Sequence, residues 1–575
     1  MKYYLNKFRI HDLGLLGLLY SSHIFAQIPP NAGSITRDVI VVKPPAPTSN
    51  TTLPQTGTGV STAPKSTDTT PIPVKSITIT GATAFSPEVL QALVANVATG
   101  SHTLGQLQEA TSRITAHYRK AGYFLARAYL PAQKMEGGLV TIAVLEGKLE
   151  QVKLENTSRV SDAVVNAHLA NFVSGMVLQK EPLDRNLLLL GDVPGVGGVD
   201  SRLAPGTQVG ETVLIAKLKA APLASGRVEA DNYGGLYTGR NRLGASVDVN
   251  SPFGWGERFS ARLMGSDRDL LYGRLAAQVP VSSNGLVMGA AVGRTTYALG
   301  DTFAALDAVG RSTTGELFAR YPLVRGVDAN IYAQAAWEQR KLRDEVRSTA
   351  TTTDKHAHVG TLSLQADARD GWGGGGSTQG SLALSQGRLG IDSPGAAALD
   401  AAGAQTVGRY TKWAWAVQRQ QALGVGWRLG AQVRGQQASQ NLDSSEKLSL
   451  GGANGVRAYA SGEATGDKGW LASLELRYAI SPQVSASVFY DAGQVTVNAK
   501  PYLASPNTLR RSGTGLGLAG SYGAFDWQVA MAWRGGDAGT AEPDRQAGQV
   551  LGAGGMAVLR ELLTSLRHPG AFRTA

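Results

Sequence analysis

Apolar and polar positions alternate with a period of two along most of the chain from about residue 226. In FDWQVAMAW (525–533), aromatic and aliphatic residues fall at the odd positions, and Asp526 and Gln528 lie between them. WLASLELRYAI (470–480) repeats the pattern. Such segments are about ten residues long and suit membrane-spanning strands, whereas strands of soluble sandwiches have about five or six residues. The pattern predicts a membrane all-β barrel at 223–575, with about 16 antiparallel strands.

The connections between the predicted strands differ by side. Links after even-numbered strands are tight, as in FGWG (253–256), SSNG (282–285) and WGGG (372–375). Links after the fifth, seventh, ninth, eleventh, thirteenth and fifteenth strands are expected to be long, as in DSPGAAALDAAGAQT (392–406). Outer-membrane barrels have tight turns on one side and long loops on the other. The chain before the barrel enters from the tight-turn side, which is therefore predicted to be the periplasm.

Two smaller units precede the barrel, at 74–149 and 150–222. Each follows the order strand, helix, helix, strand, strand. In the first unit, Ser86 and Pro87 are typical of a helix start, and apolar residues follow with helical spacing. The exposed edge of such a sheet can take up an extended peptide as an added strand. The alternative is that both units are inert spacers.

The first residues predict export. MKYYLNKFR carries basic residues and precedes the short apolar run LGLLGLLYSSHIF, and Ala26 suits a cleavage site. This is the layout of a secretory signal peptide over residues 1–26; the run is short for the alternative, an uncleaved anchor helix. Within residues 27–73, PPNAGSITRDVIVV (29–42) is expected to form a short ordered element. The rest is rich in Pro, Thr, Ser and Gly, which predicts a flexible linker.

Composition narrows the classes of function. Charged residues make up only 17% of the chain, which suits a large β protein. The absence of cysteine excludes disulfides, thiolate metal sites and thiol nucleophiles. The net charge is +11, but the basic residues are scattered singly, which argues against nucleic-acid binding. The histidines show no metal spacing, and GGSTQGS (375–381) follows no buried parallel strand, so neither an enzyme nor a cofactor is predicted.

One irregular segment carries the candidate functional residues. The stretch 440–467 is the longest irregular segment of the predicted barrel, and glycines surround its single arginine. Glycine allows the backbone to turn tightly against a wall. The candidate residues of this loop are Gly455, Val456, Arg457 and Tyr459.

A carboxylate two strands later is the candidate partner of this loop. In VSASVFYDAGQV (484–495), the parity that points Val488 outward sends Asp491 into the lumen. Because an unpaired buried charge is costly, Asp491 needs a cation, and Arg457 could fold inward and supply a two-pronged contact. Parity alone leaves a second arrangement open, in which Arg457 is solvated outside the barrel and Asp491 pairs with Arg477.

Together these segments resemble a known family. Two POTRA-like units, a many-stranded barrel and a GVRAY loop before a strand reading FYDAG are similar to the two-partner secretion transporters (TpsB, or the ShlB/FhaC/HecB family) of the POTRA-barrel superfamily. PPNAGSITRD (29–38) resembles the family's plug region, and GYFLARAYLPAQ (122–133) its first POTRA domain. The loop signature V-R-G-[FY] carries Ala458 in place of glycine, and this VRAY variant resembles exporters of haem-acquisition and haemopexin-binding proteins.

The resemblance implies an outer-membrane pore that recognises an unfolded exoprotein through periplasmic POTRA domains and secretes it. It also implies that the loop enters the barrel and that Arg457 meets Asp491 on the thirteenth strand. The implied partners are a TpsA-type exoprotein of haem- or haemopexin-binding, haemolysin or adhesin type, outer-membrane lipid, and the barrel-assembly machinery during insertion. The alternative within the superfamily is an outer-membrane protein assembly or insertion factor; two modules after a Pro/Thr-rich linker favour secretion.

Two segments depart from the family pattern. The stretch 29–43 is short and β-branched, so a stable plug helix is not expected there. QVLGAGGMAVLRELL (549–563) is expected to make a poor sixteenth strand, and the chain does not end on the aromatic residue usual for this class. Phe572 is the candidate to stand in for that residue, unless the tail is altered or extended.

Overall fold

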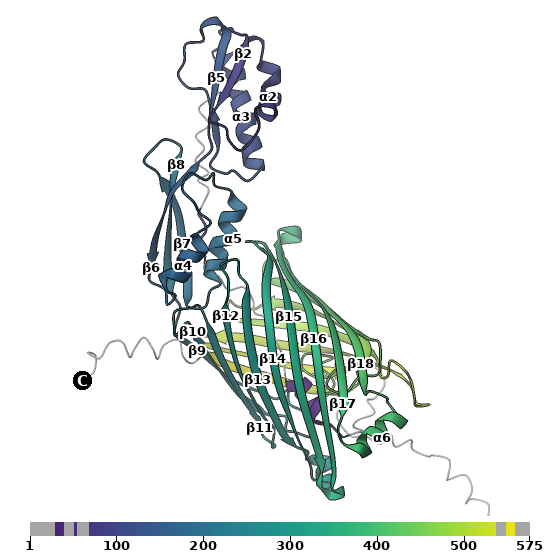
Figure 1. The fold of residues 1–575 in the computed structure, drawn as a ribbon. Coiled ribbons are helices and arrows are strands. Elements are labelled where there is room, and N and C mark those ends of the chain that lie inside the picture. The colour runs from purple at the N-terminus through teal and green to yellow at the C-terminus, as the bar shows by residue number, and fades with distance from the viewer. Residues whose placement is uncertain (1–28, 40–50, 55–67, 536–547, 558–575) are drawn as a thin grey trace, which may run out of the picture.

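The computed structural model describes residues 29–39, 51–54, 68–535 and 548–557. Two small α/β units stand one above the other at one end of a large β-barrel (Figure 1). The predicted signal peptide and most of the predicted linker lie outside the described residues. No helix within the described residues is both long and apolar enough to cross a membrane.

The large domain is a closed barrel of sixteen strands. Each strand pairs antiparallel with the barrel strand that follows it along the chain. The ring closes where β26 pairs with β9. This confirms the fold predicted from the alternating pattern. Its strands are β9 (Ala224–Asp231), β10 (Arg242–Asn250), β11 (Arg258–Ser266), β12 (Leu271–Pro280), β13 (Val287–Ala298), β14 (Ala308–Arg325), β15 (Ala329–Val346), β16 (Thr351–Asp370), β17 (Gly376–Ile391), β18 (Gly408–Gly424), β19 (Trp427–Ala438), β22 (Lys468–Ala479), β23 (Val484–Thr496), β24 (Thr508–Tyr522), β25 (Phe525–Arg534) and β26 (Gly548–Ala557).

The alternation along each strand separates a lipid-facing surface from the lumen. On β23, Val488 and Tyr490 are half exposed, whereas Phe489 and Asp491 are buried. On β25, Val529 is exposed in the same way as the outward residues of β23. An outer surface of large apolar side chains is what a membrane barrel presents to lipid.

The connections follow the predicted parity with one exception. The link between β15 and β16 is only residues 347–350, including a short 3-10 turn, and not a long loop. The reason is that β15 and β16 stay paired with each other to their ends, with Val346 opposite Thr351. The longest connection is 439–467, between β19 and β22, and we call it the sixth loop; it contains the short pair β20 (Leu448–Ser449) and β21 (Thr465–Gly466).

The sequence predicted a poor sixteenth strand at 549–563, and this prediction is wrong for the part up to Ala557. β26 is a regular strand hydrogen-bonded to β25 on one side and to β9 on the other. Its glycines supply backbone groups for both ladders, while Leu551 is buried inside and Val550 and Met556 face outward. Pairing on two sides outweighs the low strand propensity of glycine. Phe572 lies outside the described residues.

The two α/β units share one topology. In each three-stranded sheet, the first and last strands pair in parallel, and the middle strand in chain order pairs antiparallel with the last. The first unit consists of β2 (Ser76–Thr80), α2 (Pro87–Val94), α3 (Leu104–Lys120), β4 (Arg127–Tyr129) and β5 (Leu139–Leu145), with a small pair of β1 (Ile72–Val74) and β3 (Gly100–His102) beside it. The second consists of β6 (Lys148–Asn156), α4 (Asp162–Leu169), α5 (Lys180–Gly191), β7 (Val196–Pro205) and β8 (Glu211–Ala220).

The second unit is joined to the tight-turn end of the barrel by polar contacts. The Arg325 guanidinium, at the end of β14, donates to both carboxylate oxygens of Asp192 at 2.7 and 2.8 Å. Arg185 of α5 donates to the Pro322 carbonyl oxygen at 2.8 Å. These contacts set the second unit against the periplasmic mouth of the barrel.

A helix inside the barrel corrects the expectation for residues 29–43. α1 (Ala32–Val39) packs Ile35 and Val39 against apolar side chains of the lumen wall; it is the purple segment inside the barrel in Figure 1. Asn31 accepts a hydrogen bond from the Ser34 backbone N–H at 3.1 Å, which is a helix N-cap contact. An isolated helix of this length is unstable in water. Burial against the wall stabilises it, so its β-branched residues do not prevent it.

Candidate functional site: the sixth loop inside the barrel

The tip of the sixth loop is a compact turn that requires glycine at two positions. A Cβ on Gly455 would lie 2.0 Å from the Leu450 carbonyl oxygen, and one on Gly451 would lie 2.1 Å from the Ala460 carbonyl oxygen. The Val456 N–H donates to the Leu450 carbonyl at 2.7 Å across this turn. Any larger residue would push the turn open, so these glycines determine the shape of the tip.

The tip lies inside the barrel against its wall. Val456, Ala458 and Tyr459 are fully buried and pack with lumen-facing residues of β22, β23 and β25. The Tyr459 ring also lies beneath the guanidinium of Arg534, 5.0 Å from ring centroid to Cζ. The arrangement in which this loop is solvated outside the barrel is therefore wrong.

Arg457 and Asp491 are in direct contact. Nε of Arg457 donates to one carboxylate oxygen of Asp491 at 2.8 Å, and an Nη donates to the other at 2.9 Å. The Arg457 backbone N–H adds a third hydrogen bond, at 3.1 Å. Asp491 is only 1% exposed, so this guanidinium is its counter-charge.

The wall provides further contacts that the sequence interpretation missed. Arg457 donates to Glu475 at 2.8 Å and to the Ser473 hydroxyl at 3.2 Å, both on β22. Its Cζ lies 3.4 Å from the ring centroid of Phe489. Arg477, the alternative partner considered for Asp491, pairs with Glu475 instead. The alternation in WLASLELRYAI (470–480) already predicted that Ser473 and Glu475 point into the lumen. That alternation could have identified them as candidate partners of Arg457.

The electrostatics favour the charged form of the arginine. Burial alone would lower the pKa of Arg457, but the hydrogen bonds and charges of Asp491 and Glu475 outweigh it, and the net shift is upward. The tip is therefore held by one permanent cation between two carboxylates. Among the described residues, no group of three His, Asp or Glu side chains lies close enough to hold a metal ion.

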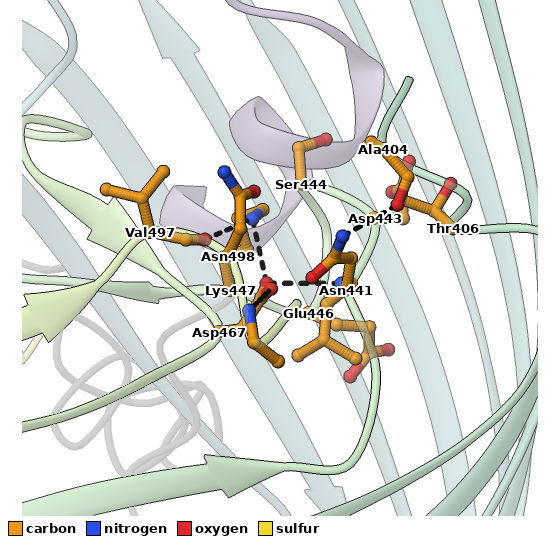
Figure 2. Close-up of polar contacts among 12 residues, drawn as sticks. Ala404, Thr406, Asn441, Asp443, Ser444, Glu446, Lys447, Asp467, Val497 and Asn498 are labelled. Atoms are coloured by element: carbon orange, nitrogen blue, oxygen red, sulfur yellow. Dashed lines mark hydrogen bonds and ion pairs between the residues drawn. The ribbon is translucent and has the colours of Figure 1, made fainter. Parts of the chain in front are cut away.

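The base of the sixth loop is held by a buried carboxylate (Figure 2). Asp467 is fully buried and forms an ion pair with Lys447 at 2.7 Å. It also accepts hydrogen bonds from the backbone N–H groups of Leu442, at 3.1 Å, and Ala499, at 2.7 Å. Since Ala499 belongs to the loop after β23, Asp467 joins two extracellular loops.

Asn441 extends this network to a third loop. Its side-chain amide donates to the Ala404 and Lys500 carbonyl oxygens, each at 2.8 Å. Ala404 follows α6 (Pro394–Ala402) in the loop between β17 and β18. Three loops that are distant in sequence therefore meet around Asn441 and Asp467, which no local pattern could have predicted.

A second group of charges ties the loop to the opposite wall. Glu446 pairs with Arg340 of β15 at 3.0 Å and with Lys412 of β18, and Asp443 pairs with Lys355 of β16 at 2.8 Å. Burial would raise the pKa of Glu446, but the two cations lower it to about 2. These carboxylates therefore remain ionised at neutral pH.

The loop also holds α1. Arg37 donates to the Ser444 carbonyl oxygen at 2.9 Å, and the Ser444 hydroxyl donates to the Asn31 side chain at 2.5 Å. The Ala32 N–H donates to Asp344 of β15 at 2.7 Å. The helix, the sixth loop and the barrel wall thus form one packed polar assembly within the lumen.

Comparisons with known proteins agree with this architecture. A family model described as Haemolysin secretion/activation protein ShlB/FhaC/HecB matches residues 210–520, and one described as POTRA domain, ShlB-type matches 72–147. The chain is 29% identical over 435 residues to the Heme/hemopexin transporter protein HuxB of Haemophilus influenzae (strain 86-028NP), which covers 73% of this chain and 76% of HuxB.

Solved structures share the fold. CdiB from Escherichia coli superimposes with a TM-score of 0.71 at 19% identity, covering 92% of this chain and 96% of CdiB. CdiB from Acinetobacter baumannii gives a TM-score of 0.63 at 17% identity, covering 85% and 91%. Because the first family model covers more than half of the chain, this protein belongs to the ShlB/FhaC/HecB family of haemolysin secretion/activation proteins.

Proposed function

We propose that this protein is the outer-membrane transporter of a two-partner secretion pair. Its barrel lies in the outer membrane and its POTRA domains lie in the periplasm. The observation that carries the function is a wide barrel whose lumen is filled by a separate helix and a loop, both held by polar contacts that can be broken without unfolding the wall. The division of the chain stays a prediction: signal peptide 1–26, plug-like segment and linker 27–73, POTRA domains 74–149 and 150–222, and barrel 223–575.

The edge strand β7 of the second POTRA sheet is the proposed docking site for the exoprotein. A segment of this chain already lies on that edge, since Thr52 pairs in parallel with β7. Its N–H donates to the Val199 carbonyl at 2.8 Å, and its carbonyl accepts from the Ser201 N–H at 3.1 Å. An edge that accepts one extended segment can accept another by strand addition.

The sixth loop and α1 are the proposed moving parts. Both occupy the lumen that an extended polypeptide would cross. Gly455, Val456, Arg457 and Tyr459 are proposed to hold the loop tip against Asp491 in the resting transporter. Release of α1, and a shift of the loop along the wall, would open a passage lined by the charges that now bind them.

The exported protein is proposed to be a haem- or haemopexin-binding exoprotein. HuxB is named a heme/hemopexin transporter, and the tip of the sixth loop reads Val456-Arg457-Ala458-Tyr459. The sequence carries no ATP-binding motif, and folding of the exoprotein outside the cell would give transport its direction.

The test is secretion of a defined partner. The candidate partner is a large exported protein sought in the neighbouring reading frames. It would be expressed with and without the transporter, and the medium and periplasm would be assayed for it. Appearance in the medium only with the transporter supports the proposal. A general loss of other outer-membrane barrels on deletion, with the exoprotein still exported, would favour an assembly factor instead.

A further inference from the structure

The outer face of the barrel carries a group of basic side chains near its loop end, which we call the basic belt. The belt spans the neighbouring strands β13 to β18, which lie side by side in Figure 1. Each member is exposed, and the next residue along its strand is buried in the lumen wall, so each side chain points outward. The members are Arg294 of β13, Arg311 of β14, Lys341 of β15, Arg388 of β17 and Arg409 of β18.

The strand register brings like charges together. Arg388 is directly opposite Arg409, and on its other side it is opposite His358 of β16. Like charges at directly opposed positions destabilise a sheet. The wall therefore tolerates a repulsion that an anion placed between these side chains would remove.

The members of the belt lack internal counter-charges. Over the part of the chain that the structure describes, none of the five makes an ion pair or a side-chain hydrogen bond. Arg343, which is not a member, shows the contrast, because it pairs with Glu345 at 2.7 Å and with Asp354 at 3.7 Å. The belt is thus a set of available cations on a surface that faces the membrane.

The height of the belt matches the head groups of the outer leaflet. On the periplasmic side of the belt, the same strands present outward apolar residues such as Trp337, Leu362 and Trp413. Arg388 is four residues from outward Leu384, which is about 13 Å along the strand and about 10 Å along the membrane normal at the usual tilt. Trp337 stacks on His358, with ring centroids 6.0 Å apart, where the apolar band meets the belt. Aromatic residues mark such interfaces.

The geometry points to a binding site for a phosphorylated lipid of the outer leaflet, the bisphosphorylated lipid A part of lipopolysaccharide. Its acyl chains would lie on the apolar band, and its phosphates between the facing guanidinium groups. Arginine binds phosphate with two parallel hydrogen bonds, and two arginines at opposed positions can hold one phosphate from both sides. The lipid would supply the anion that the register of β17 and β18 requires.

The test uses the purified full-length protein in detergent. Bisphosphorylated lipid A and its dephosphorylated counterpart would be titrated, and binding measured by native mass spectrometry and by the heat stability of the barrel. The variant is Arg388→Gln with Arg409→Gln. The matched control is Arg510→Gln, an outward arginine of β24 outside the belt, which hydrogen-bonds Gln494.

We expect the double variant to bind lipid A at least tenfold more weakly than the native chain and Arg510→Gln. Without lipid, the double variant should melt at a higher temperature than the native chain, because the repulsion is gone. If the double variant does not fold, Arg294→Gln with Lys341→Gln serves the same comparison. Equal binding of lipid A by native chain and variant, or equally tight binding of dephosphorylated lipid by the native chain, would overturn the assignment.

Discussion

The contact between Arg457 and Asp491 makes a quantitative prediction. Arg457→Ala would leave Asp491, which is 1% exposed, without its cation. Breaking a buried ion pair in this way costs about 3–5 kcal/mol. That energy shifts the equilibrium between the seated and the released loop by roughly two to four powers of ten. We expect the loop to leave the wall in this variant and secretion to be lost, while the barrel still inserts.

A double-mutant cycle separates the contact from other effects of the substitution. Asp491→Ala also removes the buried charge that Arg457→Ala leaves behind, so the double variant should be less destabilised than the sum of the single variants. A coupling energy of about 2–3 kcal/mol is expected for contacting charged groups. Arg457→Lys keeps the charge but cannot bind Asp491, Glu475 and Ser473 together, and each lost hydrogen bond to a charged group costs about 1.5–3 kcal/mol.

The assay is the melting of the barrel on semi-native gels, together with protease sensitivity of the sixth loop and export of the exoprotein. Arg477→Ala is the matched control, since Arg477 binds the other carboxylate oxygen of Glu475 and its side chain is 50% exposed. An exposed pair of this kind contributes about 0–1 kcal/mol. The reasoning is refuted if Arg457→Ala is no more disruptive than Arg477→Ala, or if the cycle is additive.

Three further predictions concern the loop base, α1 and the first POTRA domain. Asp467→Asn leaves Lys447 without its buried counter-charge, so proteolysis of the extracellular loops should increase, whereas unchanged protection would contradict the role of the base. Because the native chain has no cysteine, Gly33→Cys with Ser444→Cys can form only one disulfide, and a Cβ on Gly33 would lie 2.5 Å from the Ser444 hydroxyl oxygen, where a cysteine sulfur would stand. Export should stop until a reductant is added, and export by the oxidised variant would rule out release of α1. Burial would raise the pKa of Glu146, but hydrogen bonds from Thr83, Ala84 and Tyr118 lower it below 4.5. Its stabilising contribution is therefore present above pH 4.5 and is lost as the pH falls through the lower folded value. Backbone amides of residues 76–145 should then be less protected from hydrogen exchange in Glu146→Gln than in the native chain at pH 7. In acid the protection of the two chains should become equal. A difference in protection that stays constant with pH would contradict this.

The parts of the site that could be predicted are those governed by local spacing. The parity of β23 placed Asp491 in the lumen, because lipid and lumen impose a period of two on every spanning strand. The same parity could not choose between Arg457 and Arg477 as its partner. That choice depends on the path of a loop of irregular backbone, which carries no period.

The parts that could not be predicted depend on contacts between distant segments. α1 is too short to be stable by itself and forms against the lumen wall, and β26 is a glycine-rich segment that becomes a strand through pairing with β9 and β25. The contacts of Asn441 with Ala404 and of Asp467 with Ala499 join three loops, and the facing of Arg388 and Arg409 requires the register of two strands.

The sequence by itself determined the barrel, the side on which its turns are short and the order of elements in the two small units. These properties follow from residue periodicity and turn composition, which act over a few neighbouring positions. Only the tertiary structure decided what fills the lumen and which charges meet, because a single buried cation or a strand register depends on the whole ring being closed around it.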